Sequence, residues 1–297
     1  MATFWATFQR KGRRAIRHPE LVMVYVDKFL MSIYQFLFVR KRLYWLNRII
    51  YRLSLRGIGV WNVQNDRTSG ERYFLQKLVL KYAKQIGTPL IVLDVGANVG
   101  QYSRMVRSLV PDSRVIAFEP HPVTYRTLKK TADEYGFAAI NSGCGENPGK
   151  MILYDHIRSH NAEHASLFRD VIGVLHHGLP IEHEVQILEL DEFLTRERIA
   201  RVHLLKVDTE GYEMCVLKGL RKSIIGGRID IIQFEFNEMN VISRTFLRDF
   251  CDYLSDYELF RMMPDGLISL RSYSTETCEI FGFQNIAALR RGVNLLN

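Results

Sequence analysis

Acidic side chains follow several predicted strands of this 297-residue chain, and the first acid lies beside a glycine turn. Residues 91–100 read as an apolar strand, a sharp turn and the start of a helix. Gly96 lets the backbone approach a ligand, and Gly100 lets the helix pack close to the strand. The spacing is Asp-x-Gly-x-x-x-Gly, and Asp94 would repel a pyrophosphate. The turn therefore favours a ligand with a cationic or hydroxylated end, although a plain strand–helix turn would show the same spacing.

A second acid, Glu119, comes directly after a buried strand predicted at 114–118. In nucleotide-binding α/β folds an acid at this position binds ribose hydroxyls, and the two oxygens of one carboxylate can accept both hydrogen bonds of a vicinal diol. Pro120 and Pro122 restrict the following loop and favour a helix start. We expect Glu119 to bind a ribose rather than to be an exposed loop acid.

A third acidic group follows the strand predicted at 202–208 and contains Asp208, Glu210 and Glu213. Ligands of open α/β sheets lie at such strand ends, so this cluster favours a functional role over a structural one. Glu235 stands between two phenylalanines in the strand predicted at 230–237. That setting is unfavourable for an acid that is neither paired nor functional.

Strands that alternate with helices position these acids and predict a doubly wound, mostly parallel sheet. Ser69 is expected to cap a helix that ends at Gly87, and a further capped helix is expected from Ser243. Residues 143–146, after the third strand, would lie over an adenine, and 151–154 read as a hairpin return. The other expected strands are 89–95, 138–142, 185–188, 258–262 and 280–286, and the other expected helices are 102–109, 123–135 and 190–194.

Six histidines fall in a polar, loop-like region: His156, His160, His164, His176, His177 and His183. The first three could share one helix face, but the Glu of a His-Glu-x-x-His zinc motif is absent. Surface or lid histidines are the favoured interpretation, and a histidine base is the second. We predict no metal site among them.

The basic character of the chain, whose net charge is +8, belongs to residues 1–60, which carry twelve Lys and Arg and two acids. The apolar stretch 21–39 has Asp27 and Lys28 at its centre. Each central charge costs roughly 2.5–3.5 kcal/mol on membrane insertion, which argues against a span. No small-residue cleavage site follows, so we expect no signal peptide.

We predict an amphipathic helix on an anionic membrane surface, with a helix packed on its own domain as the alternative. The expected interfacial aromatics are Trp5, Tyr34, Tyr44 and Trp45.

The four cysteines are Cys144, Cys215, Cys251 and Cys278, and no two form a Cys-x-x-Cys pair. Isolated thiols argue against a zinc ribbon or a redox pair, and they predict reduced side chains in a cytoplasmic protein. The basic segment would hold such a protein at the inner membrane face.

Taken together, these segments resemble the FkbM-type S-adenosylmethionine-dependent methyltransferases. The resemblance covers about residues 70–288 and rests on the blocks Val-Leu-Asp-Val-Gly-Ala-Asn-Val-Gly (92–100), Phe-Glu-Pro (118–120), Leu-Lys-Val-Asp-Thr-Glu-Gly-Tyr-Glu (205–213) and Leu-Lys-Gly (217–219). It implies a Rossmann-like class I methyltransferase fold, S-adenosylmethionine as methyl donor, and transfer to a hydroxyl oxygen. Gly143-Cys144-Gly145 departs from the Ala-rich segment typical of the family.

The expected site has a donor half and a catalytic half. The residues expected to bind the donor are Asp94, Gly96, Ala97, Asn98, Gly100, Glu119, Pro120 and Gly143. The residues expected to be catalytic are Lys206, Asp208 and Glu210. A sugar hydroxyl has a high pKa, so its oxygen needs a base or a metal, and Asp208 and Glu210 are the candidate bases. A weaker alternative is one Mg²⁺ held by Asp208, Glu235 and Asn237.

We therefore expect an O-methyltransferase that acts on a glycan, a lipid-linked saccharide or a related small molecule, as in polysaccharide biosynthesis. An RNA methyltransferase is one alternative, but the chain beyond residue 60 is slightly acidic. A non-catalytic cofactor-binding module is another, but it would not need the additional carboxylates. We expect a basic helical extension at 1–67 and a methyltransferase domain at 68–297.

Overall fold

The chain divides into two compact units, Met1–Gly57 and Ile58–Asn297, in the computed structural model, which describes residues 19–156, 165–293 and 295. The division that we expect from the sequence falls at residue 67. Residues 58–67 instead belong to the second unit, since the Trp61 N–H donates to the carbonyl of Phe283 (2.7 Å) and Arg261 donates to the carbonyl of Ile58 (3.3 Å).

The first unit is helical in its described part. It contains α2 (Pro19–Phe38), η1 (Lys41–Leu43) and α3 (Tyr44–Gly57), so the helix predicted in the apolar stretch is confirmed. Within the described residues, no helix combines the length and apolar character that crossing a membrane requires. Trp5, one of the expected interfacial aromatics, lies outside the described residues.

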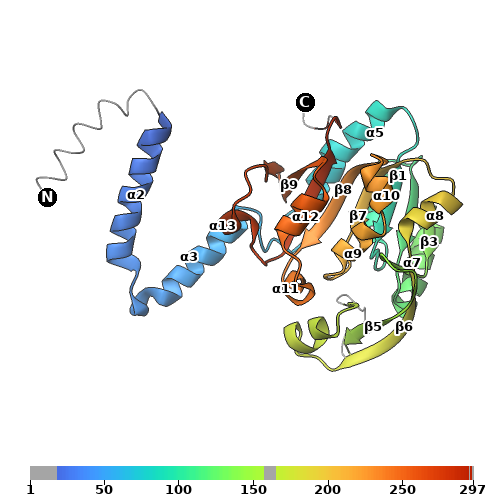
Figure 1. Ribbon diagram of the computed structural model, residues 1–297, viewed down its shortest axis with the longest axis horizontal. Helices are drawn as coiled ribbons and strands as arrows, with labels where there is room; N and C mark the ends of the chain where they lie inside the picture. Colours follow the sequence, from blue (N-terminus) through green and yellow to red (C-terminus); the bar gives the residue numbers. More distant parts are fainter. Residues whose placement is uncertain (1–18, 157–164, 294, 296–297) are drawn as a thin grey trace, which may run out of the picture. The chain divides into compact units, whose positions relative to one another are not determined.

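An eight-stranded sheet forms the centre of the second unit (Figure 1). Its strands are, in spatial order, β10 (Gly266–Ser269), β9 (Tyr257–Met263), β11 (Gln284–Arg290), β8 (Ile229–Phe236), β7 (Val202–Val207), β1 (Ile91–Val95), β2 (Arg114–Phe118) and β3 (Ala138–Ile140). The strands from β8 to β3 are mutually parallel, whereas β11 runs antiparallel to both of its neighbours. The expected Rossmann-like, doubly wound and mostly parallel sheet is confirmed.

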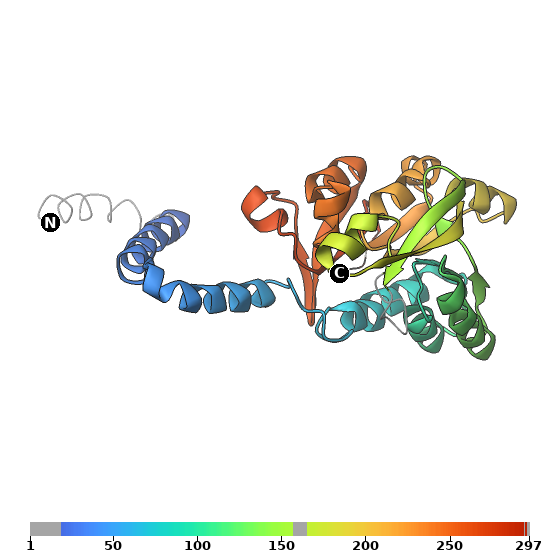
Figure 2. The same cartoon turned by 90° about the horizontal axis from the view of Figure 1, so that it is seen from below.

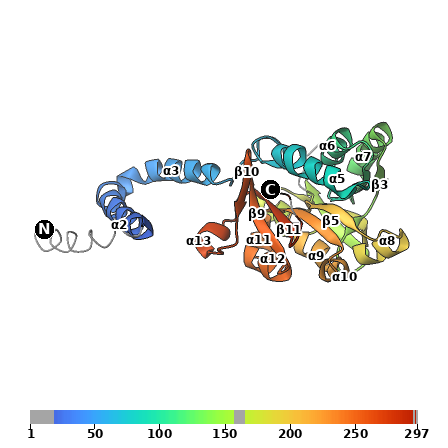
Figure 3. The ribbon, with the colours of Figure 1, turned by 90° about the horizontal axis from the view of Figure 1, so that it is seen from above.

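Helices cover both faces of this sheet because its central strands are apolar on both sides (Figure 3). On β1, Val92 and Leu93 enter different cores. The core around Val92 is built with α4 (Glu71–Tyr73), η2 (Phe74–Val79), α5 (Leu80–Ile86), α6 (Gln101–Leu109) and α7 (Pro122–Tyr135). The core around Leu93 is built with α8 (Leu190–Arg196), α9 (Glu213–Lys218), α10 (Arg221–Ile225) and α12 (Leu247–Tyr253).

A small three-stranded sheet lies at the end of the second unit where the parallel strands finish (Figure 1, Figure 2). It has the order β4 (Gly143–Cys144), β6 (Pro180–Leu188) and β5 (Gly149–His156), and β5 pairs with β6 antiparallel. The π-helical turn η3 (Val171–Leu175) packs on α11 (Met239–Ser243). This inserted segment therefore lies beside the residues that follow β7 and β8.

Three predicted strands differ in pairing or position from the observed ones. The strand predicted at 185–188 is the end of β6, which begins five residues earlier, at Pro180. The predicted hairpin return at 151–154 is part of β5, which pairs with β6 and not with the strand before it, because the chain leaves the large sheet after β3. The last strand is β11, so it begins four residues later than the predicted start at 280.

One predicted helix cap and one predicted helix start are also wrong. The helix after Ser69 is capped by Gly70, whose φ is +87° and whose added Cβ would lie 2.7 Å from the carbonyl oxygen of Met263. Ser243 ends α11, and the capped helix is α12, where the Asp249 carboxylate accepts from the Phe246 N–H (2.8 Å).

The histidine-rich segment does not form the shared helix face for His156, because that residue ends β5. His160 and His164 lie outside the described residues. His176 and His177 follow η3, and His183 lies in β6. All four cysteines are free thiols, as predicted.

Candidate active site

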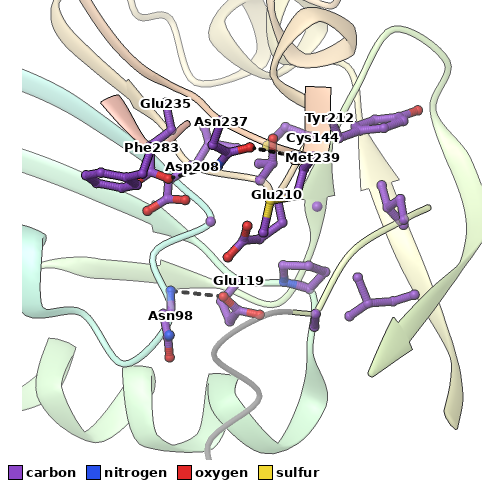
Figure 4. A pocket seen from close by; sticks show the side chains of 18 of the residues that line it. Asn98, Glu119, Cys144, Asp208, Glu210, Tyr212, Glu235, Asn237, Met239 and Phe283 are labelled. Carbon is purple, nitrogen blue, oxygen red and sulfur yellow. Dashed lines mark hydrogen bonds between the residues drawn. The ribbon is translucent and has the colours of Figure 1, made fainter. Parts of the chain in front are cut away.

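The carboxyl ends of four neighbouring parallel strands, β2, β1, β7 and β8, meet at one edge of the large sheet. Side chains that follow these strands are therefore brought together. A cavity of about 460 Å³ lies at this edge (Figure 4). The expected site residues that line it are Gly96, Asn98, Glu119, Pro120, Gly143, Asp208, Glu210, Glu235 and Asn237.

The glycine turn after β1 is held tightly against its neighbours. The N–H groups of Gly96 and Ala97 both donate to the carbonyl of Phe118 (3.0 and 2.9 Å). Gly96 has a φ of +78°, and an added Cβ would lie 1.7 Å from the carbonyl oxygen of Asp208. Only glycine avoids both the left-handed strain and this clash. Gly100 lies away from the cavity edge. Its lack of a side chain allows α6 to pack on Leu128, because a Cβ added at Gly100 would lie 2.8 Å from a side-chain carbon of Leu128.

Glu119 is buried at the end of β2, and both carboxylate oxygens are oriented by backbone donors. The Asn98 N–H donates to one oxygen (2.9 Å) and the His121 N–H to the other (2.8 Å). Burial raises the pKa of this carboxyl to about 7, against the effect of these two hydrogen bonds. Each oxygen keeps a second lone pair for a ligand hydroxyl. The arrangement presents a fixed pair of acceptors to the cavity, as a diol requires.

Asp94 lies below the turn and is fully buried. One of its oxygens accepts from the Ser103 hydroxyl (2.7 Å), and the other has no hydrogen-bond partner in the part of the chain that the structure describes. Burial raises the pKa of Asp94. Asp94, Ala97 and Lys206 line a second cavity of about 840 Å³, and this cavity shares Gly96, Asn98, Asp208 and Glu235 with the first.

Lys206 is a buried cation surrounded by carboxylates. Its Nζ lies 2.8 Å from Oδ2 of Asp208 and 5.2 Å from the centre of the Tyr102 ring. Burial acts to lower the pKa of Lys206, but the surrounding carboxylates, with Asp208 first and Asp94 next, raise it well above the usual value. Lys206 therefore stays charged and fixes the Asp208 carboxylate rather than serving as a base.

Glu210 reaches the cavity from a strained backbone position. Its φ is +52°, a left-handed value that is uncommon for a residue with a side chain. The buried Ser166 hydroxyl donates to the carbonyl of Glu210 (2.8 Å). In Figure 4 the Glu210 carboxylate extends into the cavity on the side of Glu119. The left-handed backbone thus directs this carboxylate into the cavity, and the Ser166 contact from the inserted segment stabilises this conformation.

Glu213, the third acid of the cluster, has a structural role that the sequence reasoning missed. It is 1% exposed, and one oxygen accepts from the backbone N–H groups of Thr209 (2.9 Å) and Gly211 (3.1 Å) and from the Thr209 hydroxyl (3.1 Å). Burial raises its pKa to about 7. This carboxyl organises the turn between β7 and α9 instead of facing a ligand.

Glu235 and Asn237 lie at the end of β8, and their polar atoms already contact one another. The Asn237 amide donates to Glu235 (3.3 Å), while its oxygen accepts from the Met239 N–H (3.0 Å). Burial, with the charges of Asp208 and Glu210, raises the pKa of Glu235 well above its usual value. The Mg²⁺ alternative stays a prediction.

Several cavity residues carry no sequence signal for this role. Phe283 precedes β11, Met239 begins α11, and Leu167 belongs to the inserted segment. They come from distant parts of the chain and are apolar, so neither spacing nor charge identifies them. They form the apolar part of the wall.

Comparison with known proteins places this site in a family. The family described as the methyltransferase FkbM domain matches residues 94–258, more than half of the chain. A "Methyltransferase 1" of Beauveria bassiana is 28% identical over 147 residues, which are 43% of this chain and 57% of that protein. A "31-O-demethyl-FK506 methyltransferase FkbM" of Streptomyces tacrolimicus is 25% identical over 50% of this chain and 65% of that protein.

A third relative is a "Hexuronic acid methyltransferase AglP" of Haloferax volcanii, 25% identical over 56% of this chain and 62% of that protein. The matched part thus spans less than two thirds of the length of each of these three curated relatives. The family match begins at Asp94 and includes the glycine turn, Glu119 and the block from Lys206 to Glu213. This chain belongs to the FkbM methyltransferase domain family.

Proposed function

We propose that this protein is an S-adenosylmethionine-dependent O-methyltransferase whose acceptor is a hydroxyl of a glycan, a lipid-linked saccharide or a related small molecule. The observation that carries the proposal is the pairing of two carboxylates in one cavity. Glu119 presents two oriented acceptors at the end of β2, and Glu210 extends into the same space from the turn after β7. A diol-binding acid and a candidate base in one cavity suit a nucleoside-containing donor and a hydroxyl acceptor.

The residues present fit S-adenosylmethionine, which supplies an electrophilic methyl group on a positively charged sulfur when bound. Glu119 would hold the ribose diol, and Pro120, Gly143 and Cys144 would form the surface under the adenine. The unpartnered buried oxygen of Asp94 adds negative potential below the glycine turn, which suits a cationic ligand. Gly96, Ala97 and Asn98 form the turn between the two cavities.

We propose Glu210 as the general base that accepts the proton of the acceptor hydroxyl. Asp208, the other candidate, is held by Lys206 at 2.8 Å, and this ion pair favours a positioning role for Asp208. Lys206 stays a cation and balances the charge of the surrounding acids. A carboxylate base at the correct distance contributes roughly 10²–10⁴-fold to such a reaction.

The acceptor side of the cavity is formed in part by the inserted segment. Leu153 of β5, Ala165 and Leu167 line the cavity opposite the strand ends, with Met239 beside them. Apolar surface with a few polar groups suits the faces of a sugar ring or a similar small acceptor. The Haloferax volcanii relative is named a hexuronic acid methyltransferase, which supports a saccharide acceptor and a role in polysaccharide biosynthesis.

The test measures donor binding and methyl transfer separately. Calorimetry with S-adenosylmethionine should show one binding site, and labelled donor should transfer methyl groups to extracted cell-surface glycans. Glu210→Gln should reduce transfer roughly 10²–10⁴-fold while donor affinity changes less than threefold. Glu134→Gln, at an exposed position of α7, is the matched control. Donor binding without transfer to any hydroxyl acceptor would favour a binding module, and transfer to RNA would favour the RNA alternative.

We further propose that the first unit holds the protein at an anionic membrane surface, on the cytoplasmic face. Residues 28–57 contain seven Lys and Arg and no acid. The same segment exposes large apolar side chains, among them Phe36 (72%), Tyr44 (64%) and Trp45 (62%). Exposed apolar groups beside clustered cations suit the boundary between lipid headgroups and chains.

Flotation with anionic liposomes tests this membrane proposal. The full chain should float with vesicles that contain phosphatidylserine and not with neutral ones. The charge-reversal variant Arg48→Glu/Arg52→Glu should lose flotation, whereas Lys77→Glu/Lys84→Glu, which changes exposed cations of the second unit, should keep it. Equal flotation of both variants would contradict the proposal.

A further inference from the structure

Three side chains from three separate elements converge beside the ribose-binding end of the cavity. His121 precedes α7, Asp155 lies near the end of β5, and His183 lies in β6. One ligand-capable atom of each lies within 4.8 Å of those of the other two. Nε2 of His121 lies 3.3 Å from Oδ2 of Asp155, and the two imidazole rings are 4.5 Å apart at an interplanar angle of 75°.

The register of the small sheet produces this convergence. Asp155 pairs with Ile181 and Leu153 pairs with His183, so Asp155 and His183 are diagonal neighbours on the same face of the β5–β6 ribbon. That face meets the loop that carries His121. No sequence spacing reveals the cluster, because its first and last members are more than sixty positions apart.

Two of the three residues are buried, and His183 is half-buried. His121 is 4% exposed and Asp155 is 7% exposed. Among the described residues, Nε2 of His121 is buried without a hydrogen-bond partner, although a carboxylate oxygen lies close to it. Buried polar atoms of folded proteins are nearly always paired, so an atom of this kind beside a carboxylate and a second imidazole points to a cation site.

The other nitrogen of His121 is already anchored. Nδ1 accepts from the backbone N–H of Thr124 (3.3 Å), as the N-cap of α7, and lies 3.2 Å from the Thr124 hydroxyl oxygen. Metal binding through Nε2 requires the tautomer in which Nδ1–H donates to the Thr124 hydroxyl in place of accepting this capping bond. The lone pair of Nε2 then faces the cluster, which is the arrangement of a metal-binding imidazole with a hydrogen-bonded second nitrogen.

We propose that His121, Asp155 and His183 bind one divalent transition-metal ion, with Zn²⁺ as the reference ion. Two imidazole nitrogens and one carboxylate oxygen form a donor set that suits Zn²⁺, whereas Mg²⁺ and Ca²⁺ favour oxygen ligands. Zinc–ligand bonds of about 2.0–2.2 Å in a tetrahedral site separate ligand atoms by roughly 3.3–3.6 Å. The His121–Asp155 separation of 3.3 Å already has this value, and small side-chain rotations would bring His183 to it.

The ion would join the inserted segment to the donor site. The backbone N–H of His121 donates to the Glu119 carboxylate (2.8 Å), so a metal at the His121 ring fixes the loop that orients Glu119. At the same time it ties the β5–β6 ribbon, which carries part of the acceptor wall, to the loop after β2. The proposed role is structural and does not depend on the methyl-transfer reaction.

Metal titration of the full chain tests the site. Chelator-treated protein is titrated with ZnCl₂ by calorimetry, and with CoCl₂ by visible absorption, which reports nitrogen and oxygen coordination directly. We expect one ion per chain and a rise in Tm on metal addition. His183→Ala and Asp155→Asn should each weaken Zn²⁺ binding at least tenfold and abolish the rise in Tm. His177→Ala, at an exposed histidine, should bind as the unchanged chain does.

Three outcomes would overturn the proposal. The first is no saturable Zn²⁺ binding by the folded, chelator-treated chain, which would leave a metal-free histidine–aspartate contact. The second is one-site binding that both His183→Ala and Asp155→Asn retain, which would place the ion elsewhere. The third is a loss of Zn²⁺ binding in His177→Ala as large as the loss in His183→Ala and Asp155→Asn. Circular dichroism and the metal-free Tm of each variant separate loss of the site from loss of the fold.

Discussion

The Glu119 carboxylate allows the sharpest test of the donor site. In Glu119→Ala a ribose diol loses both acceptor oxygens. Each hydrogen bond to a charged group contributes about 1.5–3 kcal/mol, so two bonds contribute about 3–6 kcal/mol. Because about 1.4 kcal/mol corresponds to a tenfold change, the Kd for S-adenosylmethionine should rise at least about 100-fold.

The variant also leaves two backbone donors, the N–H groups of Asn98 and His121, without their acceptor. Loss of affinity could then arise from a disordered turn rather than from the lost diol contact. A donor-product analogue that lacks the ribose 2′-hydroxyl separates these causes. The unchanged chain should bind this analogue at least tenfold more weakly than the ribose form, whereas Glu119→Ala should bind the two equally.

Calorimetry at 25 °C measures these four affinities, with the Tm of each protein as the fold check. Glu134→Ala, at an exposed acid of α7, should show the affinities of the unchanged chain. A Glu119→Ala variant that keeps the tenfold preference for the ribose form would show that Glu119 does not bind the ribose diol. A folded Glu119→Ala variant whose Kd for S-adenosylmethionine rises less than about threefold would show the same.

Three further predictions concern stability, measured by urea unfolding. Gly96→Ala should lose several kcal/mol or fail to fold because its Cβ would lie 1.7 Å from a backbone oxygen. Gly292→Ala, with φ +90° and no neighbour within 4 Å among the described residues, should lose only about 1–2 kcal/mol, and equal losses would contradict the prediction. The pKa of Glu213 is raised from 4.5 to about 7, so its contribution to the free energy of unfolding is complete below pH 4.5 and is lost as the pH rises through 7. Relative to Glu213→Gln, the free energy of unfolding of the unchanged chain should fall by up to about 3 kcal/mol between these pH values. A difference between the two proteins that does not change with pH would refute this prediction. Lys206→Met should lose about 3–5 kcal/mol at pH 7 because it leaves Asp94 and Asp208 without their cation. A variant as stable as the unchanged chain would show that the ion pair is dispensable.

Much of the donor half of the site could be predicted because its signals are local. An apolar run that ends in a glycine turn specifies a buried strand and a helix start, and the position of Glu119 follows from the end of the next strand. The structure places both at the same sheet edge. The predicted cap at Ser69 and the predicted helix start at Ser243 were wrong. Gly70 caps the helix that begins at Glu71, and the second helix begins at Leu247, because tertiary contacts and not the nearest serine decide these positions.

The acceptor half depends on contacts that have no signature in the sequence. Ser166 supports Glu210 across more than forty positions, and Phe283 reaches the cavity from the last part of the chain. Glu210 and Glu213 are the same residue type and lie only three positions apart. Their opposite roles arise because the left-handed backbone at Glu210 turns one side chain into the cavity, while the other turns inward to the N–H groups of Thr209 and Gly211.

The sequence by itself determined the alternation of strands and helices, the glycine turn, the acids at the strand ends and the basic character of the first sixty residues. These features depend on residue type and short spacing, which act through local sterics and burial. Tertiary structure alone decided which carboxylates face the cavity and that His121, Asp155 and His183 meet. The direction of a side chain depends on its own φ and ψ and on partners far away in the chain, and neither is encoded in the distance between acids along the sequence.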